Sequence, residues 1–351
     1  MKKTIAVLPG DGVGPEVVNE AIKAIRTVGE KFNHKFEFAH GLIGAAAIDK
    51  TGNPYPKETE KLCRSSDAIL FGAIGDLKYD SDPTLKVRPE QGLLKMRKNL
   101  GLYANVRPIN VFESLTDKSP LKKEIVEGVD FVVVRELIGG IYFGKRGRNK
   151  KGDQAFDTSA YSRKEIARVA EFAFKLATRR KKKITVVDKA NVLETSRLWR
   201  ETVNELKIKN EKLKIDYMYV DNAAMQIIKN PKQFDVILTE NMFGDILTDE
   251  ASVLTGSIGM LPSASIGEKV ILYEPIHGSY PKAAGKNTAN PIGAILSAAM
   301  MLDYSFGLKE ESRTIYESVK KTLKRGLGTK DIIDKNPLST SELGNVIISF
   351  I

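Results

Sequence analysis

A chain of 351 residues is too long for one ordinary compact core, so its length predicts two domains or one large α/β unit. The content of 42% hydrophobic and 28% charged residues excludes a disordered or fibrous protein. A net charge of +11 admits an anionic small molecule, a nucleic acid or a membrane surface as partner.

The single cysteine and the first residues bear on location. Cys63 alone excludes an internal disulfide and a cysteine-based zinc cluster, and it suits a reducing compartment. The apolar run after Met1-Lys2-Lys3 is stopped by Pro9, which predicts a strand and a turn, not a signal peptide. The longest apolar stretch, residues 292–302, falls short of the ~20 residues of a membrane helix. We therefore expect a cytoplasmic protein.

Short apolar runs alternate with segments of helical period, which is typical of parallel sheets covered by helices. The first helix is expected to begin at Gly14-Pro15 and to continue through Val28, because proline favours the first helical turn. Strands are expected at 4–8, 36–38, 68–71, 105–111, 130–134, 184–188, 215–220, 235–239 and 270–273.

The middle of the chain contains one capped helix and one irregular stretch. Ser162 and Glu165 predict a capping box that opens a helix through Leu176, and the basic run 179–183 is interpreted as a solvated helix end. Residues 138–161 are Gly-rich and basic without a clear period, which is typical of a functional segment or of an excursion to another subunit. Further helices are expected at 91–100, 309–324 and 341–350.

The segment Gly10-Asp11-Gly12-Val13-Gly14-Pro15 follows a strand and opens a helix, as a dinucleotide-binding glycine loop does. That fingerprint has glycine or alanine at its sixth position, where the helix packs closely on the strand. Proline at this position argues against an ordinary Rossmann site.

Two aspartates stand four residues apart in Asn241-Met242-Phe243-Gly244-Asp245-Ile246-Leu247-Thr248-Asp249. If a helix begins near Asn241, Asp245 and Asp249 share one face and repel each other. A divalent cation would remove this repulsion, and oxygen-only ligands favour Mg²⁺ or Mn²⁺. The alternative is a solvated acidic helix edge. Apolar Phe243, Ile246 and Leu247 argue against it, because a fully solvated helix would be polar.

A third carboxylate and a lysine also follow expected strands. Asp221 comes after the strand 215–220, and Lys189 follows the strand 184–188. Ligands of open α/β sheets gather at the carboxyl ends of strands, and a lysine near a metal can act as a base. A helix cap or a surface charge is the alternative for each residue.

Three arginines form a complementary set: Arg97 in the helix 91–100, Arg107, and Arg135 at the end of an apolar strand. A buried guanidinium requires an anionic partner, and guanidinium groups bind carboxylates through paired hydrogen bonds. Together with a metal, the set indicates a small, multiply anionic organic acid. A structural ion pair is the alternative for each arginine.

The segment 274–291 is rich in glycine and proline, which fix an irregular backbone path. It indicates a binding loop.

Taken together, these motifs resemble those of the metal-dependent β-decarboxylating dehydrogenases, which act on isopropylmalate, isocitrate, homoisocitrate or tartrate. The resemblance runs from Leu8-Pro9-Gly10-Asp11-Gly12 to the C-terminal helices. It implies an isopropylmalate/isocitrate dehydrogenase-like α/β fold, in which two domains share a central sheet, and not a Rossmann fold. Residues 1–102 and 256–351 would form a cofactor-binding domain. Residues 103–255 would form the metal, substrate and dimerisation domain, with an intersubunit arm at about 138–161.

The resemblance also implies a role for each candidate residue. Asp221, Asp245 and Asp249 match the metal ligands, and Arg97, Arg107 and Arg135 match the arginines that hold the malate carboxylates. Tyr142 and Lys189 fall at the acid and base positions. The segment 277–290 matches the family's adenosine-binding loop. The implied cofactor contacts are Val13, Glu90, His277, Gly278, Ser279, Tyr280, Pro281, Lys282, Ala284, Gly285, Ala289 and Asn290.

Within the family, Glu90-Gln91-Gly92-Leu93-Leu94-Lys95-Met96-Arg97 is similar to the isopropylmalate branch. Isocitrate enzymes place small polar residues where this chain has Leu93 and Leu94, whereas two leucines would contact an isopropyl group. Val192 would add a contact from a second subunit, and the implied substrate contacts also include Glu90 and Asp221. The resemblance thus implies oxidative decarboxylation of 3-isopropylmalate to 2-oxoisocaproate in leucine biosynthesis, by a homodimer whose sites share Lys189, Val192 and Asp221.

The departure from this branch is Lys282, where the branch usually carries an aspartate that binds the adenosine ribose. A lysine would favour the 2′-phosphate of NADP. NADP enzymes of the isocitrate branch have a tyrosine after that lysine, whereas this chain has Ala283. We therefore expect NAD, with NADP as the alternative. Activity on malate, tartrate or homoisocitrate is a second possibility. A basic nucleic-acid-binding α/β protein is a third, supported only by the net charge of +11 and the lysine runs.

Overall fold

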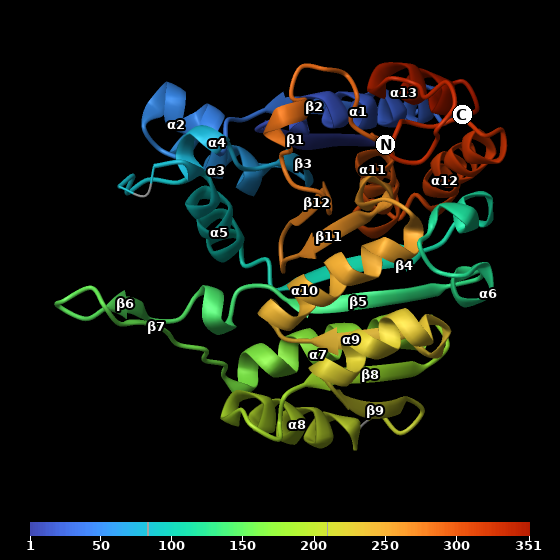
Figure 1. The fold of residues 1–351 in the computed structure, drawn as a ribbon. Coiled ribbons are helices and arrows are strands. Elements are labelled where there is room, and N and C mark those ends of the chain that lie inside the picture. Colours follow the sequence, from blue (N-terminus) through green and yellow to red (C-terminus); the bar gives the residue numbers. More distant parts are fainter. Residues whose placement is uncertain (83, 209) are drawn as a thin grey trace. The chain divides into compact units, whose positions relative to one another are not determined.

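The computed structural model describes residues 1–82, 84–208 and 210–351, and the chain separates into two compact units. Unit 1 comprises Met1–Leu102, Phe112–Lys118 and Thr255–Ile351, and unit 2 comprises Tyr103–Val111 and Ser119–Leu254. Both chain ends lie in unit 1, as Figure 1 shows. The expected roles, cofactor binding for residues 1–102 and 256–351 and binding of metal and substrate with dimerisation for 103–255, stay predictions.

Unit 1 has five strands in the order β2-β1-β3-β12-β11. β1, β2, β3 and β12 run parallel, and β11 is antiparallel to β12. Every residue of β3 is buried, as expected for a strand that is covered on both faces. The strands are β1 (Lys2–Gly10), β2 (Lys35–His40), β3 (Ala68–Ala73), β11 (Pro262–Ile266) and β12 (Ile271–Pro275).

Two helices of unit 1, α1 and α12, pack against an apolar third one. This helix, α11 (Ile292–Tyr304), is apolar nearly all round and is buried against α1, α12 and the strands β11 and β12. The predicted helix at Gly14 is confirmed, because α1 has proline in its first turn. The other helices are α1 (Gly14–Lys31), α2 (Ala45–Thr51), α3 (Lys57–Ser65), α4 (Leu77–Asp80), α5 (Pro89–Leu100), α12 (Lys309–Lys324) and α13 (Thr340–Ile348).

Unit 2 has five strands in the order β4-β5-β10-β8-β9, of which only β4 runs antiparallel to its neighbour. Thr239 of β10 is in register with Arg135 of β5 and with Val187 of β8, so these strands end at one edge. The strands are β4 (Ala104–Asn110), β5 (Asp130–Glu136), β8 (Lys183–Asp188), β9 (Lys214–Tyr219) and β10 (Val236–Thr239).

Two helix pairs cover these strands, α7 with α8 and α9 with α10. The expected capping box is confirmed at the start of α7, where Ser162 accepts from the Glu165 amide. The helix expected near Asn241 is confirmed as α10. The helices are α6 (Lys123–Val126), α7 (Arg163–Thr178), α8 (Glu194–Lys207), α9 (Val220–Lys229) and α10 (Asn241–Ser252).

Two expectations need correction. The stretch 138–161 is not wholly irregular, because β6 (Arg146–Arg148) and β7 (Ala155–Asp157) pair antiparallel in a hairpin that Figure 1 shows extending from unit 2. The basic run 179–183 is not simply a solvated helix end. Arg180 is half-buried and forms ion pairs of 2.7 Å with Asp130 and 2.8 Å with Asp235, because a guanidinium beside buried strand ends requires anionic partners.

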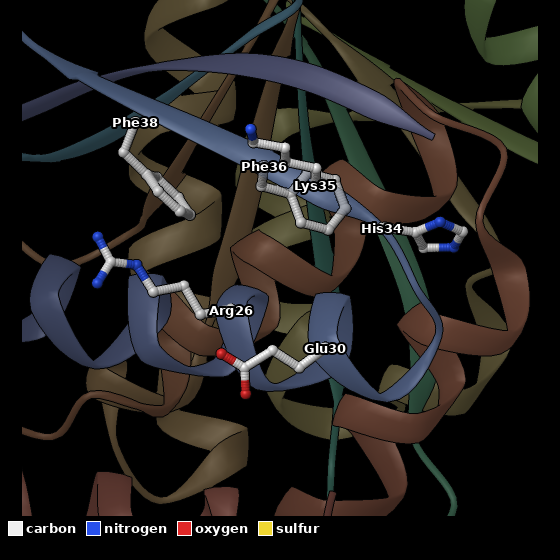
Figure 2. A pocket seen from close by; sticks show the side chains of 6 residues that line it. All are labelled: Arg26, Glu30, His34, Lys35, Phe36 and Phe38. Atoms are coloured by element: carbon white, nitrogen blue, oxygen red, sulfur yellow. The ribbon is translucent and has the colours of Figure 1, made fainter.

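No helix among the described residues is long and apolar enough to cross a membrane. A hollow of about 320 Å³ lies in unit 1 between α1 and β2, lined by Arg26, Glu30, His34, Lys35, Phe36 and Phe38. Figure 2 shows that Arg26 and Glu30 come from α1, in its C-terminal half, while the other four side chains come from β2 and the residue before it. None of the six is a predicted site residue.

Candidate functional site

The glycine loop after β1 is hydrogen-bonded to other segments of unit 1 through Asp11. The Asp11 carboxylate accepts hydrogen bonds of 2.9 Å from the amides of Ala45 and Ala46, and of 3.0 Å from the Gly75 amide. A carboxylate of the chain therefore occupies the N-terminus of α2, where free amides attract an anion. A Cβ on Gly12 would lie 1.9 Å from the Ser279 carbonyl oxygen, so this loop is packed against another segment. This packing agrees with the expected absence of an ordinary Rossmann site.

The loop 277–290 is attached to the start of α1. The Val13 amide donates to the Ser279 carbonyl at 2.8 Å, and the Gly285 amide donates to Glu16 Oε1 at 2.6 Å. His277 Nε2 is buried and has no hydrogen-bond partner among the described residues. Burial lowers the pKa of His277, so its ring is neutral at neutral pH. A neutral imidazole with an unused nitrogen can bind an uncharged polar group.

Other predicted residues of this loop differ in exposure. Lys282 is exposed in the short turn Pro281–Ala283, and the Tyr280 side chain is 63% exposed. Asn290 is buried, and its Nδ2 donates to Asp331 at 3.0 Å while its Oδ1 accepts from the Ile292 amide. Asn290 therefore fixes the end of the loop to α11. Its expected contact with a cofactor stays a prediction.

The helix α5 carries the predicted residues of unit 1. Arg97 is buried and pairs with buried Glu274 at 3.2 Å. Leu93 and Leu94 are half-buried, and Glu90 is exposed in the first turn. A Cβ on Gly75 would lie 3.3 Å from Glu90 Oε1 and 3.1 Å from Ser279 Oγ, so Glu90 and Ser279 flank the same backbone position. The structure thus brings the start of α5 close to the loop 277–290.

In unit 2, five predicted residues meet at the edge where β5 and β10 end. Arg107 lies 3.7 Å from Asp245 and 3.8 Å from Asp249, while Arg135 is hydrogen-bonded to Asp245 Oδ1. Tyr142 donates to Asp245 Oδ2 at 2.9 Å. α10 can approach β5 closely because residue 244 is glycine, where a Cβ would lie 2.7 Å from Arg135 Cβ.

This cluster places two guanidinium groups, of Arg107 and Arg135, beside two carboxyl groups, of Asp245 and Asp249. Burial first, and then Asp245, raise the pKa of Tyr142, so its hydroxyl keeps its proton at neutral pH. Burial raises the pKa of Asp249 above its ordinary value, and neighbouring Asp245 adds to the rise while Arg107 opposes it. Two carboxylate groups beside two guanidinium groups can hold a cation and an anionic ligand side by side.

Lys189 and Asp221 form a separate pair. A hydrogen bond joins Lys189 Nζ to Asp221 Oδ1, and it holds the pKa of the exposed Asp221 carboxyl below its ordinary value. The Lys189 backbone is fixed because its amide donates to Ser196 Oγ at 3.0 Å. Val192, one turn further, is 60% exposed. Among the described residues, no group of three or more His, Cys, Asp or Glu side chains is placed to hold a metal, so one chain does not collect the three expected ligands.

Several residues around the cluster were not predicted. Asn105 accepts from Arg107 Nε at 2.6 Å, and Thr248 accepts from Arg107 Nη1. Asn241 accepts two bonds from Arg135. A polar residue two positions from Arg107 on the same strand face was the one available signal for Asn105.

Comparisons with known proteins agree over nearly the full chain. The family model "Isocitrate/isopropylmalate dehydrogenase" matches residues 4–347. A 3-isopropylmalate dehydrogenase of Bacillus subtilis is 56% identical over 347 residues, which cover 97% of this chain and 95% of that protein. The structure of an isocitrate dehydrogenase from Methylococcus capsulatus aligns with a TM-score of 0.89 at 32% identity and covers 99% of both chains. A β-decarboxylating dehydrogenase from Thermococcus kodakarensis aligns with a TM-score of 0.80 at 35% identity over 99% of this chain and 96% of that one. The chain therefore belongs to the isocitrate/isopropylmalate dehydrogenase family, with its mixed α/β fold.

Proposed function

We propose that this protein oxidatively decarboxylates 3-isopropylmalate to 2-oxoisocaproate with reduction of NAD, as a step of leucine biosynthesis. The observation that carries the proposal is the cluster of Arg107, Arg135, Tyr142, Asp245 and Asp249, which combines carboxylate binding, a proton donor and metal-ligand chemistry. The choice of substrate is supported by relatives such as the Bacillus subtilis protein, whose name states this activity.

The residues present fit a divalent cation. Asp245 and Asp249 offer only oxygen donors, which are the ligands that Mg²⁺ and Mn²⁺ prefer, and they share one face of α10. Asp245 and Asp249 of one chain with Asp221 of a second chain would hold Mg²⁺ or Mn²⁺. When bound, the cation supplies positive charge that stabilises negative charge developing on the C2 oxygen.

The protein's own groups would then bind the substrate and move its protons. Arg107 and Arg135 would bind the malate carboxylates through charge-assisted hydrogen bonds. Lys189 would accept the C2 hydroxyl proton while a hydride passes from C2 to the nicotinamide. The bond from C3 to its carboxylate then breaks and releases CO₂. Tyr142 would give a proton to C3, which completes 2-oxoisocaproate.

Unit 1 would supply the remaining contacts. Leu93 and Leu94, with Val192 of a second chain, would contact the isopropyl group, and Arg97 would add a third guanidinium. The adenosine half of the cofactor would lie on the loop 277–290. The unused, buried Nε2 of His277 supports this placement, because a bound base would supply the partner that it lacks.

The active form would be a homodimer with shared sites. Three apolar residues on or next to the adjoining helices α9 and α10 are exposed in the single chain: Met225 of α9 at 58%, Ile246 of α10 at 59%, and Val253, directly after α10, at 41%. Such an apolar patch beside the cluster fits burial against a second copy. A second copy would also bring Lys189, Val192 and Asp221 to the cluster.

The proposal is tested by following reduction of NAD and NADP with 3-isopropylmalate, homoisocitrate, isocitrate, malate and tartrate, in Mg²⁺ or Mn²⁺ and in excess chelator. We expect the highest kcat/KM with 3-isopropylmalate and NAD, and no turnover in chelator. Preference for an unbranched substrate would assign the protein to another activity of the family. No turnover of any of these acids, together with salt-dependent binding of nucleic acid, would favour the basic nucleic-acid-binding alternative.

A further inference from the structure

We infer that Asn241 is a positioning residue, which aligns the guanidinium of Arg135 and the segment that carries Tyr142 with respect to Asp245. The inference rests on the proposed function for the roles of Arg135 and Tyr142. Its geometric basis is independent of that function, because it consists of contacts within unit 2 alone.

The side chain of Asn241 is 1% exposed and makes hydrogen bonds at both ends. Its Oδ1 accepts from Arg135 Nε at 3.0 Å and from Arg135 Nη2 at 2.7 Å. Its Nδ2 donates to the Gly139 carbonyl oxygen at 3.0 Å. The amide orientation is unambiguous, because a guanidinium only donates and a carbonyl only accepts. One side chain thus joins the end of β5 to the segment that follows it.

The backbone of Asn241 completes the connection. Its amide donates to the Tyr161 hydroxyl at 3.0 Å, and Tyr161 lies against Gly139 and Gly140, where a Cβ would lie 2.7 Å and 2.2 Å from Tyr161 atoms. The Gly140 amide donates to the Ala160 carbonyl at 3.1 Å. Asn241 therefore contacts both ends of the stretch that bears the β6–β7 hairpin.

The residues that Asn241 binds are close to Tyr142 and Asp245, both in the chain and in space. The short turn Gly140–Tyr142 directly follows Gly139, and the Tyr142 hydroxyl meets Asp245, one turn beyond Asn241 on α10. Because Arg135 is also bound to Asp245, rotation of its guanidinium would disturb both the carboxylate-binding group and the carboxylate. Small misplacements of such groups can lower rates by about 10²-fold.

Two substitutions separate the hydrogen bonds that the side chain makes to Arg135 from the one that it makes to Gly139. Asn241→Asp keeps an acceptor for Arg135 but cannot donate to Gly139, whereas Asn241→Ala removes all three hydrogen bonds. Asn204→Asp is the matched control, because it makes the same atomic change at an exposed position on α8 and keeps the acceptor for Tyr217. Each variant is assayed as the full chain with 3-isopropylmalate, NAD and Mg²⁺.

We expect Asn241→Asp to lower kcat by about 10- to 100-fold with less than about threefold change in KM, because the acid Tyr142 is displaced while Arg135 stays held. Asn241→Ala should also raise KM by about tenfold or more, because Arg135 is released. In D₂O, the wild type should place deuterium on one face of C3, and Asn241→Asp on both faces, since solvent then protonates the enolate.

A second measurement needs no substrate. Relative to the other amides of unit 2, those in 138–143 should exchange about fivefold faster or more in both Asn241 variants and not in Asn204→Asp. Unchanged exchange in this segment would overturn the inference whatever the enzyme's substrate proves to be. A lower kcat with deuterium still on one face would also overturn it, because the role would then be structural. An inactive wild type with faster exchange in the variants would instead defeat the proposed function and leave the positioning supported.

Discussion

The hydroxyl of Tyr142 donates a 2.9 Å hydrogen bond to Oδ2 of Asp245, whereas Lys189 is bound to Asp221. The expected acid and base of one chain are therefore held by different carboxylates. If active sites are shared, the Tyr142–Asp245 pair of one chain works with the Lys189–Asp221 pair of another.

A complementation experiment tests this sharing. Tyr142→Phe and Lys189→Met should each be inactive as homodimers. Co-expressed in equal amounts, they should regain about one quarter of the wild-type activity, because half of the dimers are mixed and each mixed dimer contains one intact site. Mixed dimers that are purified through separate tags should reach about one half of the wild-type activity, because every one of them then contains one intact site. No recovery in verified mixed dimers would place acid and base in the same chain.

The leucines of α5 should determine the preference for a branched substrate. Leu93→Ser with Leu94→Asn should lower kcat/KM for 3-isopropylmalate by the equivalent of about 1–3 kcal/mol and affect malate far less, since apolar pockets discriminate on that scale. Leu77→Ser, at a leucine of α4 that is 49% exposed, is the control. Equal losses on both substrates would mean that the two leucines serve only packing.

Lys282 should narrow the preference for NAD over NADP. A lysine beside the adenosine ribose would give the 2′-phosphate a charge-assisted hydrogen bond of about 1.5–3 kcal/mol. We expect NAD still to be preferred, and Lys282→Asp to raise that preference by about 10- to 100-fold, mainly through weaker use of NADP. The kcat/KM ratio for the two cofactors is measured against Lys286→Asp, an exposed lysine of the same loop. A ratio that Lys282→Asp leaves unchanged would show that Lys282 faces solvent.

Buried Glu240 should make stability depend on pH. Burial, with Glu136 and Asp188 nearby, raises the pKa of Glu240 from 4.5 to about 7, and its Oε2 has no partner among the described residues. The folded state thus holds a proton that the unfolded state releases at lower pH. The stability contributed by the neutral carboxyl is present below 4.5 and is lost as the pH rises through about 7.

Glu240→Gln removes that titration. The variant should match the wild type at pH ~4.5 and have a larger free energy of unfolding, on the order of 2–3 kcal/mol, at pH ~8. Denaturant unfolding at the two pH values gives the comparison, with Glu268→Gln as an exposed control. If the free energies of unfolding of Glu240→Gln and the wild type differ by the same amount at both pH values, the raised pKa of Glu240 does not control stability.

Elements whose signals are local could be predicted from the sequence. Pro15 marks the start of α1, and Ser162 with Glu165 marks that of α7, because each signal lies within the first helical turn. The helix α2 was not predicted, since its N-terminal amides are bound by Asp11, 34 residues away in the chain. The β6–β7 hairpin was missed because Arg146–Arg148 and Ala155–Asp157 lack the apolar alternation of a half-buried strand.

In the candidate site, too, features with a local sequence signal could be predicted, and contacts between distant residues could not. The face shared by Asp245 and Asp249 follows from helical spacing, and α10 places both beside Arg107. The pairing of Arg97 with Glu274 joins residues 177 positions apart, and no local pattern predicts it. The bonds of Asn241 were missed for a different reason. An asparagine at a helix start is ordinarily interpreted as a cap, yet here its side chain bonds to Arg135 and Gly139.

The stoichiometry of a single complete reaction tests the proposed activity most directly. With limiting 3-isopropylmalate, excess NAD and Mg²⁺, the protein should form NADH, CO₂ and 2-oxoisocaproate in equal amounts, measured by absorbance, CO₂ trapping and NMR of one sample. NADH without CO₂ would indicate a dehydrogenase that does not decarboxylate, and no NADH from 3-isopropylmalate would contradict the proposed function itself.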